Sequence, residues 1–297
     1  AMYNESYNLF RTRNLNAPSV WDYNLSAQQG IARSTAAANL TRPVPIVNGA
    51  GIINGVPLSG VAQSVVMTET AGRSRYTALS LNLQKDRGGD VYAYRLIYTL
   101  SKLSNDTEDI NFRAQDANNF AAEWGPSIND RRHIINGIFN YYAGQHFTAT
   151  VASLLQSGQP INRIPDASKY TVVDQNGKPI LGNDGKALTT NDLNGDGGAF
   201  GDAYVGNSDR QPGVSRNADR LPWSTVFDAS LQYTFGTVKR FEIRADVFNV
   251  LNNNNLSGYS NNARQSNQIQ IGPVGSAIVQ RNAAPPRQFQ FGVRYLF

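Results

Sequence analysis

The sequence predicts an all-β fold, namely an antiparallel transmembrane β-barrel, or part of one, with long extracellular loops. Its last nine residues alternate, so that one strand face carries Phe289, Phe291, Val293, Tyr295 and Phe297 and the other carries Gln, Gly and Arg. A soluble sandwich strand shows the same alternation. The connections favour the barrel, because short and long ones alternate strictly along the chain, as short periplasmic turns and long extracellular loops do.

Composition excludes several other classes. The chain has 297 residues, no Cys and only 16% charged residues. No apolar run approaches the roughly 20 residues of a transmembrane helix, whereas a barrel dilutes its lipid-facing residues with polar lumen-facing ones. The 27 Lys and Arg are scattered, so we expect no nucleic-acid partner. We also expect no enzyme, since no Ser, His and Asp arrangement and no carboxylate pair stands out.

Seven segments have the alternation of membrane strands, which is weaker in 133–142 and 147–156, and residues 3–9 could form one further short strand. The seven are 76–85, 92–102, 133–142, 147–156, 225–235, 241–252 and 289–297. Short connections follow the first, third and fifth of them. Long connections cover 103–132, 157–223 and 253–287.

The N-terminal quarter differs from the rest. Residues 1–72 are rich in Asn, Ala, Ser and Gly and have little periodicity. We therefore expect an extracellular loop region there, with at most one strand, and barrel strands over residues 73–297.

A run of acidic and amide residues in the second long connection suggests a metal. Residues 192–197 spell D-x-N-x-D-G, the opening of a calcium loop, with Asp192, Asn194 and Asp196 as oxygen ligands. The twelfth position is Ala203 instead of Glu, and Asp202 is the neighbouring carboxylate. An Asx-rich turn without metal is the alternative. Ca²⁺ would stiffen the loop, and no cofactor is otherwise required.

Charged residues also occur on the polar parity of the strands. They are Arg95, Asp228, Glu242, Arg244, Asp246 and Arg294. In a barrel this parity faces the lumen. We expect these side chains to form a charge network between neighbouring strands, or else to contact a plug or substrate.

Six segments, in order, resemble motifs of Oar-like TonB-dependent receptors. Residues 76–85 match Y-x-A-L-x-L-x-L-x-K, 98–102 match Y-T-x-S-K, 129–133 contain D-R-R-H, 156–160 match x-S-G-x-P, 246–252 match x-x-F-N-V-x-N, and 286–292 match P-R-x-x-Q-x-G. In the third motif, Asp130, Arg131, Arg132 and His133 lie where a loop enters a strand. We expect them to anchor that loop rather than bind a ligand.

The resemblance implies a fold and a set of partners. Such receptors have large plugged barrels of about 22 strands, so this chain would supply about the last 7–8 strands. Expected partners are outer-membrane lipid, the remaining strands and plug from the same receptor or another chain, TonB through that plug, and the barrel assembly machinery, which reads an ending like Phe289–Phe297. A closed eight-stranded barrel using residues 3–9 is the alternative.

The implied function is substrate uptake across the bacterial outer membrane, driven by TonB. Two other functions are compatible with the same strands. One is a structural or surface-interaction barrel component, adhesin-like or part of a split barrel, in which the long loops act. The other is a small passive pore.

Overall fold

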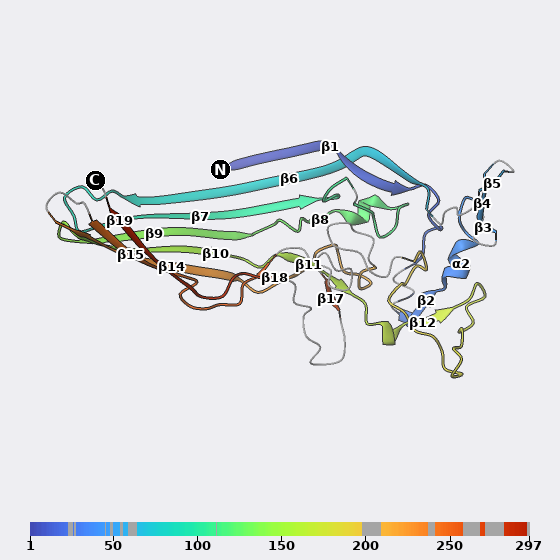
Figure 1. The fold of residues 1–297 in the computed structure, drawn as a ribbon. Coiled ribbons are helices and arrows are strands. Elements are labelled where there is room, and N and C mark those ends of the chain that lie inside the picture. Colours follow the sequence, from blue (N-terminus) through green and yellow to red (C-terminus); the bar gives the residue numbers. More distant parts are fainter. Residues whose placement is uncertain are drawn as a thin grey trace.

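The computed structural model describes residues 1–22, 26, 28–44, 46–47, 50–53, 56–58, 64–110, 112–197, 209–236, 241–257, 268–270 and 282–295. Their regular structure is almost entirely antiparallel sheet, which confirms the predicted all-β class (Figure 1). The named helical elements are α2 (Thr35–Asn39) and two 3-10 turns at Phe120–Glu123 and Ala167–Lys169. No helix in these ranges is long and apolar enough to cross a membrane.

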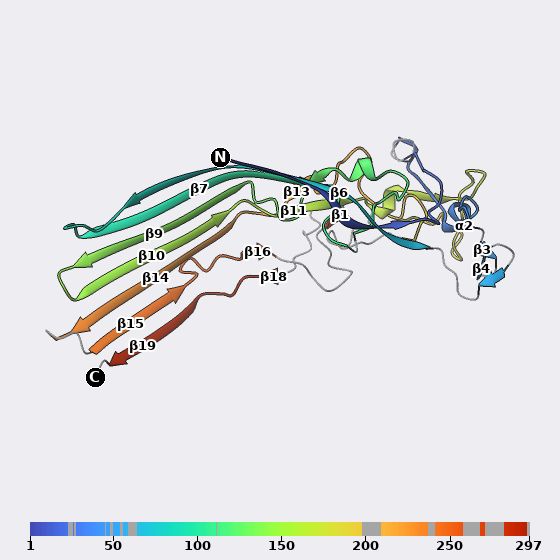
Figure 2. The ribbon, with the colours of Figure 1, turned by 90° about the horizontal axis from the view of Figure 1, so that it is seen from above.

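Eight long strands form one sheet, and each pairs antiparallel with the next (Figure 2). In order across the sheet they are β1 (Met2–Asn14), β6 (Val66–Lys85), β7 (Tyr92–Asn105), β9 (His133–Ala143), β10 (Phe147–Gln156), β14 (Ser224–Phe235), β15 (Phe241–Phe248) and β19 (Gln288–Tyr295). The two-residue β8 (Gly125–Pro126) pairs with the end of β7.

Register gives this sheet one apolar and one polar face, because directly paired residues point to the same side. One row across six strands contains Tyr94, Phe139, Val151, Ala229, Val247 and Phe289. The adjacent row contains Ala93, Asn140, Thr150, Ser230, Asp246 and Gln290. The alternation read from the sequence is thus continuous from strand to strand.

Three strand boundaries differ from the sequence expectation. The first strand runs to Asn14, and β6 begins at Val66, so the expected division at residue 72 falls inside a strand. The strand expected to reach residue 252 ends at Phe248. It ends there because Asn249 and Asn252 have φ of 50° and 53°, left-handed values that turn the chain.

The sheet is open at both edges. Within the described residues, β1 pairs only with β6 and the terminal β19 only with β15, and the two edge strands do not pair with each other. The closed eight-stranded alternative is therefore not formed, and the sheet is part of a barrel wall.

The long connections gather at one end of the sheet, which we call the loop end, and tight turns join the strands at the other, the turn end (Figures 1 and 2). We call the described residues of connections 15–65, 106–132, 157–223 and 249–287 the loop layer. Its small strands are β2 (Ile31–Arg33), β3 (Ile46–Val47), β4 (Ala50–Ile53), β5 (Val56–Leu58), β11 (Pro160–Ile164), β12 (Thr171–Val173), β13 (Asp219–Arg220), β16 (Leu256–Ser257), β17 (Gln268–Gln270) and β18 (Asn282–Ala283).

The apolar core lies in the loop layer. Among described residues, the buried apolar side chains are Ala17, Ala32, Ala37, Ala38, Phe112, Ala114, Phe120, Ile128, Ile161, Tyr170, Val173, Leu193 and Leu221. None of these belongs to the eight long strands. One cluster, formed by Ala32, Tyr170 and Leu193, packs connection 15–65 against connection 157–223, and a second, formed by Phe112, Ala114 and Phe120, lies within connection 106–132.

Candidate functional site

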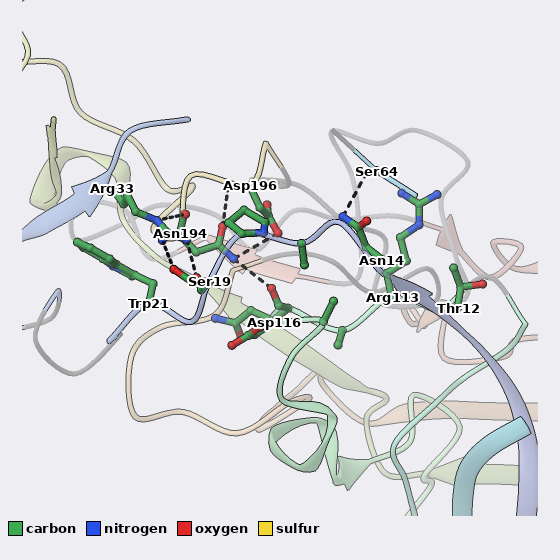
Figure 3. Close-up of a pocket in the computed structure, with 15 residues that line it drawn as sticks. Thr12, Asn14, Ser19, Trp21, Arg33, Ser64, Arg113, Asp116, Asn194 and Asp196 are labelled. Atoms are coloured by element: carbon green, nitrogen blue, oxygen red, sulfur yellow. Dashed lines mark hydrogen bonds between the residues drawn. The ribbon is translucent and has the colours of Figure 1, made fainter. Parts of the chain in front are cut away.

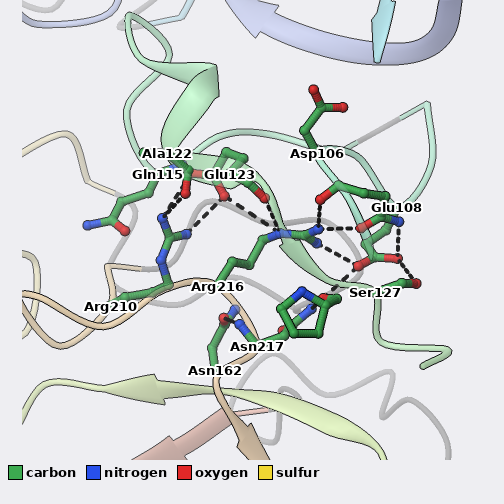
Figure 4. Close-up of polar contacts among 12 residues, drawn as sticks. Asp106, Glu108, Gln115, Ala122, Glu123, Ser127, Asn162, Arg210, Arg216 and Asn217 are labelled. Atoms are coloured by element: carbon green, nitrogen blue, oxygen red, sulfur yellow. Dashed lines mark hydrogen bonds and ion pairs between the residues drawn. The ribbon is translucent and has the colours of Figure 1, made fainter. Parts of the chain in front are cut away.

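Two long connections are joined by a buried arginine. The Arg216 side chain is 1% exposed and makes an ion pair of 2.5 Å with Glu108. Its Nε donates to the carbonyl oxygen of Glu123 at 2.8 Å, and its Nη2 donates to that of Asn105 at 2.6 Å (Figure 4). Arg216 thus ties connection 157–223 to connection 106–132 and to the end of β7.

The carboxylates around this arginine are fully hydrogen-bonded. Glu123 receives two bonds from Arg210, at 2.9 and 3.2 Å, and one from the Gln115 backbone at 2.9 Å. Glu108 accepts from Ser127 and the Ile128 backbone at 2.9 and 3.1 Å. Two arginines are therefore balanced by two glutamates, an arrangement in which removing one partner leaves a buried charge.

Asp130, expected at the strand rim, is at the centre of a second cluster. Its buried carboxylate accepts from the Leu103 backbone at 2.8 Å and pairs with Arg132 at 3.4 Å and with Arg220. Arg220 also donates to the carbonyl oxygens of Asp130 and Gly158, at 2.8 and 3.1 Å. This cluster connects the start of β9 to the segment that precedes β14.

Arg131 and His133 contact the neighbouring strand end. Both meet Ser157, through a 3.3 Å bond from Arg131 to its carbonyl oxygen and a 3.1 Å bond from the His133 backbone to its hydroxyl. The His133 ring lies between Tyr98 and Trp223, with centroids 6.1 and 5.7 Å away. The structure thus brings all four expected rim residues to the junction of the sheet and the loop layer.

A polar cavity lies between connections 15–65, 106–132 and 157–223 (Figure 3). Arg33 donates to the carbonyl oxygens of Asn194 and Ser19 at 2.8 and 3.0 Å, and its guanidinium lies 5.3 Å from the Trp21 ring. The cavity holds about 50 Å³, enough for a few waters. An adjoining groove of about 330 Å³ shares Trp21 and is within the range of small-ligand sites.

The expected calcium loop forms the edge of this cavity. The Asp192 carboxylate accepts from the Gly195 and Gly197 backbones at 2.9 and 3.0 Å, and Asn194 accepts from the Asp196 backbone at 2.8 Å. These bonds are Asx turns. Asp202 lies outside the described residues, and those that are described contain no cluster of three or more acidic, His or Cys side chains able to hold a metal. The calcium site stays a prediction.

A further carboxylate is buried beside this loop. Asp209 accepts bonds from the Leu193 and Asn194 backbones. Burial raises the pKa of Asp209 well above its usual value, and the charges of Asp196 and Asp192 raise it further. Burial also raises the pKa of Asp192. Of these three carboxylates only Asp196 lines the cavity, and the negative charges of Asp192 and Asp196 disfavour ionisation of the buried Asp209.

The six residues expected to face the lumen all lie on the polar face of the sheet, as pairing shows. On β15, Glu242 is opposite Arg294, and Arg244 donates to Asp246 at 2.8 Å. On β14, Asp228 accepts from the Asn249 backbone at 2.8 Å.

Arg95 is separate from the other five, because β9 and β10 lie between its strand β7 and β14. Its one described hydrogen bond goes to Asn82 at 3.4 Å. The polar face therefore carries a local network near the C-terminal edge and an isolated cation near the N-terminal edge.

The aromatic and apolar side chains of the C-terminal strand β19 lie on its exposed face. Phe289, Phe291, Val293 and Tyr295 share one face and are exposed, Phe291 by 81%. Phe297 lies outside the described residues. A row so exposed on an edge strand requires lipid or another protein surface to cover it.

Sequence reasoning did not single out the arginines that organise the loop layer. Arg216 and Glu108 are 108 residues apart and follow no periodic pattern. The available signal was the concentration of arginine over residues 210–220 in a chain with few charges. Trp21, Trp124 and the cations near Trp124 were also missed, because they belong to connections or to polar strand ends.

A sheet with one apolar and one polar face, open at its edges and covered at one end by folded loops, is characteristic of an outer-membrane β-barrel wall. The chain belongs to the outer membrane beta barrel domain family, whose model matches residues 3–290. This membership places the protein in the outer membrane, and long connections in such barrels are extracellular.

Among solved structures, the chain is similar to the outer membrane transporter YddB from Escherichia coli, with a TM-score of 0.46 and 10% sequence identity. The alignment covers 99% of this chain and 29% of the transporter chain, so this chain spans less than a third of that protein's length. No curated protein matches the sequence.

Proposed function

We propose that this chain is the C-terminal barrel segment of an Oar-like, TonB-dependent outer-membrane receptor that imports a substrate. The observation that carries the proposal is the open sheet. An eight-stranded wall with two unpaired edges is not viable in lipid, because backbone groups there have no water to bond. Further strands must complete it, and the receptor motifs in the sequence indicate a barrel of about 22 strands.

The polar face supports a large, occupied lumen. Its rows contain Ser, Thr, Asn and Gln and the six charged residues described above, together with some apolar side chains such as Ile97 and Ile138. In a plugged receptor such a face contacts the plug and the substrate path. Arg95, with a single weak contact, and the exposed Arg244 side chain are the residues best placed to contact a plug.

The loop layer supports capture at the cell surface. Connections 106–132 and 157–223 are held together by the buried Arg216 and Arg210 pairs, and both line the groove beside Trp21. A preformed groove binds a ligand with less loss of conformational entropy than mobile loops would. Substrate would first bind in this groove and then move toward the lumen.

The test uses the receptor purified from its native outer membrane. We expect an intact mass well above the 32.5 kDa of this chain, or a co-purifying chain that supplies the plug. In planar bilayers the plugged receptor should show no steady conductance. Steady open channels from a 32.5 kDa protein would instead establish a passive pore.

A genetic arm separates uptake from surface interaction. Strains lacking the receptor or lacking TonB should share the same growth defect across a panel of scarce nutrients, because TonB supplies the energy. An adhesion defect without any shared nutritional defect would establish the structural alternative.

A further inference from the structure

We propose that the outward face of the wall carries a binding site for the phosphorylated headgroup of an outer-leaflet glycolipid, built from Arg73, Arg75 and Lys102 around Trp124. This site is separate from the substrate path. It rests on the outer-membrane location and on the loops being extracellular, and it does not require TonB-driven uptake.

Register places the cations on the lipid side of the sheet. Thr77 pairs with Lys102 and Leu79 with Leu100, so Lys102 shares the face of the leucines. Arg75 follows on the same parity and makes a 2.6 Å ion pair with Glu5 of β1. The cations therefore continue the apolar face toward the loop end and do not face the lumen.

The position of these cations along the barrel axis matches the headgroup region of the outer leaflet. Tyr92, at the turn end of β7, stacks on Tyr94 and Phe139 and marks the inner aromatic girdle. Lys102 is ten residues further along the same strand. Ten residues of strand tilted by about 40° rise about 25 Å, the height of the apolar band of such barrels. Lys102 thus lies at the outer edge of the hydrocarbon layer.

The surface around these cations is hollowed. One hollow of about 240 Å³ is lined by Arg73, Arg75 and Trp124, among others. A second, of about 310 Å³, is lined by Arg75, Lys102 and Trp124. The guanidinium groups of Arg73 and Arg75 lie 5.5 and 6.0 Å from the Trp124 ring, which holds them beside the hollows.

Positive charge is in excess at this site. Arg73 and Arg75 pair with Asp106 and Glu5, yet each side chain remains 55% exposed. The Asp106 carboxylate is buried. Lys102 is exposed, and the described residues provide no ion pair for it. Three accessible cations against one accessible carboxylate suit a phosphate, which arginine and lysine bind through charge-assisted hydrogen bonds.

The turn end of the same strands shows what an ordinary interfacial arrangement looks like. There Lys85 pairs with Asp90 and lies 4.8 Å from the Tyr92 ring. Arg87 lies 4.1 Å from the Tyr142 ring and bonds the Asp90 backbone. The cations at the turn end thus contact a carboxylate, a backbone oxygen or an aromatic ring, whereas those at the loop end line open hollows.

The test measures binding of purified phosphorylated glycolipid to the full receptor in nanodiscs. The variant is Arg73→Gln with Lys102→Gln, and the matched control is Lys85→Gln with Arg87→Gln. Each interfacial cation is worth about 1 kcal/mol, so the first variant should bind about thirtyfold more weakly. The control should bind as the unmodified receptor does. Unchanged circular dichroism and heat-modifiable migration exclude misfolding as the cause.

Two further arms identify the ligand. Removing the phosphates from the glycolipid should reduce binding to the level of the first variant. Millimolar inorganic phosphate should not displace the lipid, because acyl chains hold the headgroup at the surface. The proposal is overturned if both variants weaken equally, if dephosphorylated lipid binds as well, or if free phosphate competes fully.

Discussion

The wall and the loop layer of this chain are stabilised in opposite ways. In the loop layer, apolar side chains such as Phe112, Ile128 and Leu193 are buried. In the wall, large apolar residues such as Leu81, Leu231 and Phe291 are exposed. The loop layer therefore buries apolar side chains as a water-soluble protein does. The wall is surrounded by lipid as its apolar environment, and backbone hydrogen bonds between neighbouring strands are its main internal interaction.

The two regions also differ in the exposure of ion pairs, as one pair from each region shows. Arg216 and Glu108 are both 1% exposed, whereas the side chain of Arg244, paired with Asp246 on the wall, is 53% exposed. Exposed pairs contribute little to stability, and breaking a buried pair is costly. Substitutions in the two regions should therefore have effects of different size.

Replacing Arg216 with Ala should destabilise the loop layer by about 3–5 kcal/mol, because Glu108 remains as a buried charge without its arginine. Hydrogen exchange of peptides from 106–132 and 209–223 measures this as a lower free energy of local opening. Exchange in β10 and β14 should be unchanged. The control Arg95→Gln on the wall should change both regions by under about 1 kcal/mol. Equal loss of protection in wall and loops would contradict the separation.

Charge on the two wall faces should have unequal effects. Val151→Arg places a cation on the apolar face and should cost about 2–4 kcal/mol of folding free energy in lipid vesicles. Thr150→Arg, one residue away on the polar face, should cost far less. Denaturant titration of folding into vesicles gives both values. Similar costs for the two variants would mean that the faces are assigned incorrectly.

The junction between the two regions should be sensitive to one methyl group. A Cβ on Gly158 would lie 1.5 Å from the carbonyl oxygen of Leu221, so the backbone must shift. We expect Gly158→Ala to cost about 1–3 kcal/mol, as overpacking does. Gly144, in the tight turn at the other end of β10, is the control, because its Cβ would meet nothing within 4 Å. Because Gly144 has φ of 65°, its substitution with Asn rather than Ala avoids backbone strain. Thermal unfolding ranks the two variants.

Calcium should give the smallest effect, and only in the loop layer. If residues 192–197 bind Ca²⁺ with the affinity of extracellular modules, a Ca²⁺ concentration about ten times the Kd stabilises the loop by about 1.4 kcal/mol. Hydrogen exchange of this segment with calcium or a chelator measures the change. Asp196→Asn should abolish the response, while Asp184→Asn, in a separate turn, should not. A segment indifferent to calcium is an Asx turn without metal.

The wall could be predicted from sequence to the extent that lipid imposes alternation. β10 was bounded correctly at Phe147 and Gln156, because its apolar parity continues through the bilayer. The N-terminal half of β6, Val66 to Arg75, was not predicted. It carries Thr, Glu and Arg, because no lipid contact requires alternate residues to be apolar there. In β1 the register shifts between Ser6 and Leu9, and Asn8 has φ of 59°, so the alternation breaks.

The loop layer was less predictable, because its contacts are not local. The expected rim residues Asp130 to His133 do meet at a junction, but Arg220, the main partner of Asp130, lies 90 residues away from it. The Arg216 cluster and the cations around Trp124 depend on how separate connections pack. No spacing rule within one segment encodes such contacts, whereas the parity of a strand is encoded by its own residues.

The two faces of the wall can be tested directly, because this chain contributes no cysteine. Leu231→Cys and Gln232→Cys place a thiol on the apolar and on the polar face of β14. In native outer membranes, the thiol at 231 should react with a lipid-soluble maleimide and not with a charged, water-soluble one. The thiol at 232 should show the reverse preference. If the charged reagent labels both positions equally, the sheet does not lie in a membrane and the account is wrong.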